Sequence, residues 1–122
     1  MDKNFRLYWI PVISWAILIF ALSSVSRFPK QLEPVFLVDK LAHSIEYAIF
    51  GFLLARAFKN SRESNLKKFF RVFAMICVIV YGITDEWHQS FVPYRTASGL
   101  DLLSDGIGGM IGQMFYRNKT KT

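Results

Sequence analysis

Both histidines and six of the nine acidic residues of this 122-residue chain lie in stretches that are otherwise apolar. A charge at membrane depth or in an apolar core is costly unless it is paired or hydrated, so these side chains are candidates for function. Carboxylates and imidazoles in such settings can move protons, hold a cation or bind a polar ligand. The eight residues are Asp39, His43, Glu46, Asp85, Glu86, His88, Asp101 and Asp105.

Helical spacing brings most of these residues onto shared faces, because side chains three, four or seven positions apart lie on one stripe of a helix. In helices that cross a membrane, such a stripe would not face lipid. We therefore expect the stripes to converge in one polar pocket that opens to the outer side of the membrane. Lys40, Arg95 and Ser98 could complete the pocket, with Arg95 as an electrostatic anchor. The stripes comprise Asp39, His43, Glu46 and Tyr47; Asp85, His88 and Gln89; and Asp101, Asp105, Gly108 and Gly112. Glu86 is a further candidate for the pocket.

A buried network that only locks the helices together is the alternative interpretation, with Arg95 paired to Asp85 or Asp101. The six acids outnumber Lys40 and Arg95, and this excess favours protonated carboxyls, a bound cation or a polar ligand. Histidine and carboxylates can bind a divalent metal, but no motif such as His-Glu-x-x-His is present. The sequence therefore predicts no metal site and identifies no cofactor. No serine triad or nucleophile elbow is recognisable, so whether the chain is an enzyme stays open.

Four apolar blocks position these residues, at about residues 7–25, 37–58, 69–89 and 100–116. A bilayer core of ~30 Å needs about 17–25 helical residues, and lipid offers no hydrogen bonds to the backbone. The blocks therefore predict an all-α fold, a four-helix transmembrane bundle that forms a single domain over residues 1–122.

The composition agrees with a membrane protein. The chain is 52% hydrophobic and 20% charged, against about 25% charge in an average soluble domain. A soluble bundle with an unusually apolar core is the alternative, and the run Ala16–Ala21 counts against it because it has no polar face. The first block could also be a signal peptide ending near Ala21-Leu22-Ser23, although it is long for one.

The basic residues predict the orientation. Most of the 15 Lys and Arg residues lie near the N-terminus, in the segment 56–71 or in the C-terminal tail. Short cytoplasmic loops are enriched in Lys and Arg, so both termini and this segment are expected inside. We therefore attribute the net charge of +6 to membrane topology, with anionic lipid as the partner of the inner loop and no role for nucleic acid.

Three local features follow from residue types. Glu33-Pro34 is expected in an extended or turned outer connection. Asp39 is expected at the N-cap or in the first turn of the second helix. Gly108 and Gly112 form a small-xxx-small pair that permits close approach of another helix.

Two motifs resemble those of the VanZ-like family. The first comprises residues 39–47 followed by Gly51-Phe52-Leu53-Leu54, and the second comprises residues 84–93. The resemblance extends from about residue 8 to 116, and Ser23-Ser24 is also typical. Tyr94 departs from the pattern, which usually has a small residue there. After the second motif the matching residues are Arg95, Ser98, Asp101, Asp105 and Gly108.

The resemblance implies a small multi-pass protein of the bacterial cytoplasmic membrane, associated with the cell envelope. The family's namesake is an accessory factor in resistance to the glycopeptide antibiotic teicoplanin. Three functions remain open for the outer polar residues. The first is binding of an envelope ligand, lipid head group or glycopeptide. The second is a membrane-embedded enzyme acting on a lipid-linked or phosphorylated envelope substrate, and the third is a small transporter with the acids as proton relays.

Overall fold

A computed structural model describes residues 3–24, 33–91 and 99–116, leaving aside the side chains of residues 33–40. Within these ranges the chain is all-helical and has no strand, which confirms the predicted fold class at this level. The helices are α1 (Lys3–Ser23), α2 (Glu33–Lys59), α3 (Ser64–Lys68), α4 (Phe70–Gln89) and α5 (Gly99–Phe115).

The four long helices correspond to the four predicted blocks. The structure differs from the prediction at the N-terminal end of α2 and in the connection between α2 and α4. The expectation of a non-helical Glu33-Pro34 is wrong, since α2 begins at Glu33. Proline is tolerated there because amides in the first turn have no intrahelical acceptor. Asp39 lies in the second turn of α2, so it is not the N-cap. The short helix α3 was not predicted, and its N-cap is Glu63, whose side chain accepts from the Asn65 amide at 2.9 Å.

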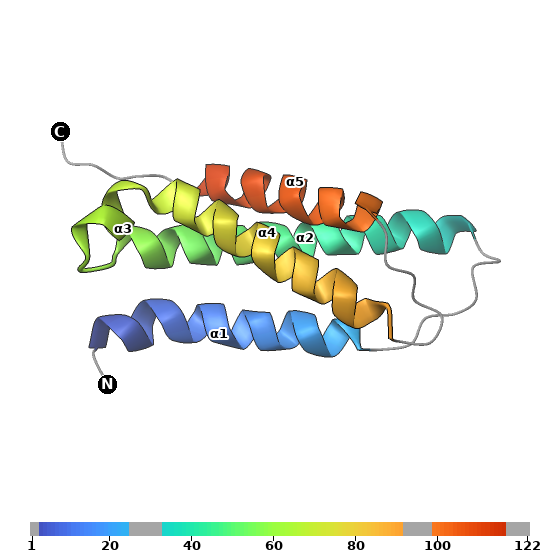
Figure 1. The fold of residues 1–122 in the computed structure, drawn as a ribbon, viewed down its shortest axis with the longest axis horizontal. Coiled ribbons are helices and arrows are strands. Elements are labelled where there is room, and N and C mark those ends of the chain that lie inside the picture. Colours follow the sequence, from blue (N-terminus) through green and yellow to red (C-terminus); the bar gives the residue numbers. More distant parts are fainter. Residues whose placement is uncertain (1–2, 25–32, 92–98, 117–122) are drawn as a thin grey trace.

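The long helices run antiparallel to their neighbours in the chain (Figure 1). Helices α2 and α5 lie side by side, and α4 crosses them at an angle. Helix α1 lies on the side of α2 and α4 that is away from α5. The start of α1, the helix α3, the start of α4 and the end of α5 gather at one end of the molecule. We call this end the basic end, because the segment 56–71 lies there.

Small residues let α2 and α5 approach each other at backbone distance. A Cβ added at Gly108 would lie 2.9 Å from the Cα of Ser44, and one at Gly112 would lie 2.7 Å from the Cα of Ala48. Contacts this short do not occur between real Cβ atoms, so the approach requires glycine at these positions. This close pair fixes the relative height of the polar residues on α2 and α5.

Side-chain hydrogen bonds of Trp15 and Tyr81 help to join α1 to the rest of the bundle. The indole Nε1 of Trp15 donates to the Glu46 carbonyl at 2.9 Å, and the Tyr81 hydroxyl donates to the Ala16 carbonyl. At the basic end, Arg71 donates to the carbonyls of Gln113 (2.7 Å) and Tyr116 (2.9 Å). A cation at this position complements the negative end of the α5 helix dipole.

The distribution of polarity is inverted relative to a soluble protein. Helices α1 and α2 are long and apolar enough to cross a membrane, whereas α5 has 17 residues and α4 carries Arg71, Asp85 and Glu86. Nevertheless, α4 and α5 expose large apolar side chains while burying their acids. The exposed side chains are Val72, Ile76, Ile79, Val80, Ile83 and Trp87 on α4, and Leu100, Leu103, Ile107, Met110, Ile111, Met114 and Phe115 on α5. Such an exterior suits lipid.

Candidate functional site: a buried polar cluster

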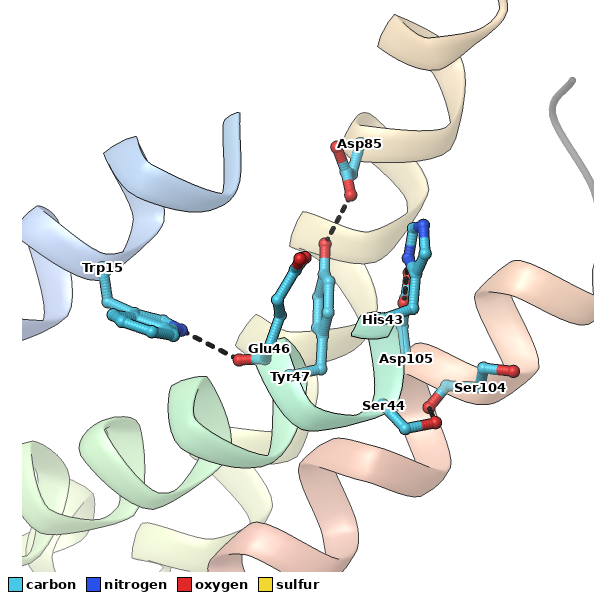
Figure 2. A network of polar contacts seen from close by, with 8 residues as sticks. All are labelled: Trp15, His43, Ser44, Glu46, Tyr47, Asp85, Ser104 and Asp105. Atoms are coloured by element: carbon cyan, nitrogen blue, oxygen red, sulfur yellow. Dashed lines mark hydrogen bonds and ion pairs between the residues drawn. The ribbon is translucent and has the colours of Figure 1, made fainter. Parts of the chain in front are cut away.

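The polar residues of three helices meet in the interior of the bundle, in the half away from the basic end (Figures 1 and 2). All seven side chains of this polar cluster are buried, with at most 8% of each residue exposed. Contacts connect His43 and Tyr47 from α2 with Asp85 and Glu86 from α4 and Asp105 from α5. Gln89 and Asp101 are counted with them because they are buried and lie one turn from Asp85 and Asp105 on the same helices.

His43 and Asp105 link α2 to α5 through their side chains. The Nδ1 atom of His43 lies 2.9 Å from Oδ1 of Asp105, and the dashed line between the two side chains in Figure 2 marks this contact. His43 is next to Ser44 in the chain and Asp105 lies about one turn before Gly108, so the close packing of α2 and α5 at the Ser44–Gly108 contact positions this pair. A histidine held by a carboxylate has a defined tautomer and orientation, which suits it to bind a ligand or move a proton.

Tyr47 and Asp85 link α2 to α4. The Tyr47 hydroxyl donates to Oδ2 of Asp85 at 3.0 Å, and Tyr47 is fully buried. Its ring packs edge-on against Phe50 and at a tilt against Tyr81. Tyr47 therefore connects these aromatic rings to the carboxylate, and Figure 2 shows its hydroxyl directed at Asp85.

Glu86 joins His43 and Asp105 from the third helix. One ligand atom from each of these three buried residues lies within 4.8 Å of the other two. The second oxygen of Asp105, Oδ2, faces α4, since it lies 3.4 Å from where a Cβ of Gly82 would be. Gly82 is one turn before Glu86 and leaves room for this carboxylate. Sequence reasoning missed Gly82, although its spacing of four from Glu86 put it on the same face.

Several buried polar atoms of the cluster have no hydrogen-bond partner among the residues that the structure describes. They are Oδ2 of Asp105 and both amide atoms of Gln89. Gln89 is 1% exposed and Asp105 is fully buried, so bulk water does not replace the missing partners. An unpaired buried polar atom costs about 1–3 kcal/mol, which makes these atoms candidates for a bound ligand or ion.

His88 does not share the environment of the cluster. Its Nε2 atom lies 2.9 Å from the Ser24 hydroxyl, and its ring centroid lies 4.4 Å from that of Phe20, so it faces α1. His88 was expected on one face of the helix with Asp85 and Gln89, but it faces α1 instead. At about 100° per residue, Asp85, Gln89 and Glu86 span an arc of roughly 100°, and His88 lies about 60° beyond it.

The other predicted site residues are divided between neighbouring and undescribed positions. Glu46 is half-buried beside Tyr47, and its carbonyl accepts the Trp15 bond (Figure 2). Helix α2 includes Asp39 and Lys40, but their side chains lie outside the described part. Arg95 and Ser98 lie outside the described residues, and so does the expected anchoring role of Arg95.

The sequence also matches a known protein family. The chain matches the model of the VanZ/LLP1 family over residues 3–120. It belongs to the VanZ/LLP1 family. The resemblance based on the two motifs is therefore confirmed, and with the apolar helices α1 and α2 it indicates a membrane protein. No curated protein and no solved structure matches the chain.

The polar cluster of this VanZ/LLP1 chain is rich in hydrogen-bond acceptors. Four buried carboxyl groups belong to the cluster, against one histidine and one tyrosine hydroxyl as titratable partners within it. Such a site can bind a cation, hold protons, or accept hydrogen bonds from a ligand that brings donors.

Proposed function

We propose that this VanZ/LLP1 protein crosses the bacterial cytoplasmic membrane four times and binds a polar envelope ligand at the buried polar cluster. Helices α1, α2, α4 and α5 are the spans, both termini are cytoplasmic, and the cluster lies in the outer half. The ligand is the head group of an envelope lipid or a glycopeptide. As a membrane protein of this family it is related to proteins associated with antibiotic resistance, and the ligand gives that association a physical basis.

The inverted polarity of α4 and α5 supports four spans. Each of these helices turns its carboxylates and glycines inward and its large apolar side chains outward. A helix with this pattern is stable in lipid even when its mean hydropathy is modest, because the charges face protein. The antiparallel order of the long helices supports two termini on one side.

The basic end supports the proposed orientation. Arg56, Lys59, Lys67, Lys68 and Arg71 all lie in the α2–α4 connection or its flanks, at the same end as the start of α1. A cluster of this kind is typical of the cytoplasmic side, where anionic lipid head groups are its natural partner. The polar cluster then faces the outer leaflet.

The excess of buried carboxyl groups carries the ligand proposal. Four acids in one interior require protons, cations or donors to balance them. Ethanolamine head groups, amino sugars and glycopeptides present ammonium or amide donors of this kind. The unpartnered atoms of Gln89 and Asp105 are acceptors and donors available for such a group.

Lipid exchange measured by native mass spectrometry tests the proposal. Protein in detergent is mixed with phosphatidylethanolamine or with phosphatidylcholine, whose trimethylated head group lacks N–H donors. We expect preferential retention of phosphatidylethanolamine, lost in Asp85→Asn and kept in Arg62→Lys at the basic end. Equal retention of both lipids by the unaltered protein would argue against recognition of donors by the cluster.

An enzyme is the second candidate, and the His43–Asp105 pair favours it. A histidine oriented by a carboxylate at 2.9 Å is a common general base, and Glu86 lies within reach as a second acid–base group. Incubation with lipid-linked or phosphorylated envelope substrates distinguishes the two functions. A binder retains the compound unchanged, whereas an enzyme releases a product, and His43→Gln abolishes that release.

A further inference from the structure

The juxtaposition of His43, Glu86 and Asp105 has a chemistry beyond ligand binding by donors. The three residues come from α2, α4 and α5, and each is buried. One imidazole nitrogen and two carboxylate oxygens form a set of ligand atoms that all lie within 4.8 Å of one another. No metal motif marks them in the sequence, because each ligand lies on a different helix.

The separations between the three ligand atoms are close to those around a bound metal ion. Imidazole nitrogen and carboxylate oxygen bind Zn²⁺ at about 2.0–2.2 Å, so neighbouring ligands around one ion lie about 3–3.6 Å apart. The His43–Asp105 separation of 2.9 Å is near this value already. The widest separation in the trio, at most 4.8 Å, needs a shift of roughly 1 Å, which side-chain rotation of Glu86 provides.

Unpartnered atoms beside the trio form a second, independent observation. Oδ2 of the fully buried Asp105 has no hydrogen-bond partner among the described residues, and it points toward α4 near Gly82, the helix that supplies Glu86. The carboxamide of Gln89, one turn beyond Glu86 and 1% exposed, likewise lacks described partners. A bound cation would use the lone pairs of the two oxygens among these atoms, Oδ2 of Asp105 and the carboxamide oxygen of Gln89.

We propose that His43, Glu86 and Asp105 bind one divalent transition-metal ion of the Mn²⁺ or Zn²⁺ kind. Imidazole suits Zn²⁺, carboxylates suit Mn²⁺, and the trio contains no thiolate that would select a softer metal. The ion neutralises two buried carboxylates and joins α2, α4 and α5 at one point. The site does not depend on the proposed head-group function, because the metal alone is the probe.

Metal uptake by the full chain tests this proposal. Protein purified in detergent is stripped with a chelator, dialysed against Mn²⁺ or Zn²⁺ and analysed by elemental mass spectrometry. We expect about one ion per chain, and a dissociation constant raised about 100-fold or more in His43→Gln and Glu86→Gln, since loss of even an outer-shell partner costs 10–100-fold. His88→Gln and Glu63→Gln are the matched controls, with uptake as in the unaltered protein.

X-ray absorption of the unaltered, Zn²⁺-loaded protein provides a measurement that needs no variant to fold. The expected shell contains nitrogen and oxygen ligands with an imidazole signature. Failure to take up either ion in stoichiometric amount would overturn the proposal. So would equal uptake in a folded His43→Gln variant, or a shell that contains the sulfur of Cys77. If metal binds while phosphatidylethanolamine shows no preference, the head-group proposal fails and the metal site stands.

Discussion

Substitution of Gly112 by leucine is the sharpest test of the packing that holds the polar cluster together. A Cβ at Gly112 would lie 2.7 Å from the Cα of Ala48 on α2. Ordinary van der Waals contact begins near 3.4 Å, so even the first atom of the new side chain requires a shift of more than half an ångström. The rest of the leucine side chain must then separate α2 from α5. Because these helices also carry His43 and Asp105, the hydrogen bond between those residues lengthens with them.

The expected loss of stability is about 3 kcal/mol or more, at the upper end of what overpacking costs. The matched control is Gly106→Leu on the same helix, since a Cβ at Gly106 meets nothing within 4 Å. Leucine has a better helix propensity than glycine by up to ~1 kcal/mol, so the control is neutral or stabilising. Reversible unfolding of both variants in mixed micelles, followed by far-ultraviolet circular dichroism, measures the difference. Equal unfolding midpoints for Gly112→Leu and Gly106→Leu would refute the close approach of α2 and α5.

Three further predictions concern topology and the polar cluster. Reporter fusions at residue 2, in residues 60–66 and at residue 120 should be cytoplasmic, and fusions at residues 30 and 95 should be external; an external signal from residues 60–66 would contradict the orientation. Tyr47→Phe removes the 3.0 Å bond to Asp85 and should lower the free energy of unfolding by about 1–2 kcal/mol, whereas Tyr116→Phe, whose hydroxyl accepts from Asn60 at 3.5 Å, should be near neutral. Arg95→Lys should reduce ligand retention because lysine lacks the planar fork of arginine, while Arg62→Lys should behave like the unaltered protein.

Residue patterns alone were sufficient for the four long helices. Four largely apolar blocks separated by polar connections favour four helices, so α1, α2, α4 and α5 could be predicted to within a few residues. The start of α2 was missed because Pro34 resembles a helix breaker, although the first turn tolerates it. The helix α3 was missed because five residues give no periodicity, and its capping residue, Glu63, is not a preferred N-cap type.

The polar cluster could be predicted only in part, because helical period gives the face of a residue and not the partner of that face. The spacing placed His43, Asp85 and Asp105 on inward faces, and all three are buried in the structure. The direction of His88 toward α1 depends on how α4 crosses the bundle, which no spacing within one helix determines. The convergence of His43, Glu86 and Asp105 likewise depends on the relative height of three helices. That height is set by contacts such as Gly112 with Ala48, which involve two distant segments.

Photo-crosslinking from a lipid head group shows whether the polar cluster is the ligand site. Protein in nanodiscs is illuminated with a phosphatidylethanolamine analogue that carries a diazirine on its head group, and the labelled peptides are identified by mass spectrometry. We expect labelling near residues 85–89 and 101–105, which is reduced in Asp85→Asn and displaced by excess phosphatidylethanolamine. Labelling confined to the basic segment 56–71, unaffected by Asp85→Asn, would contradict it.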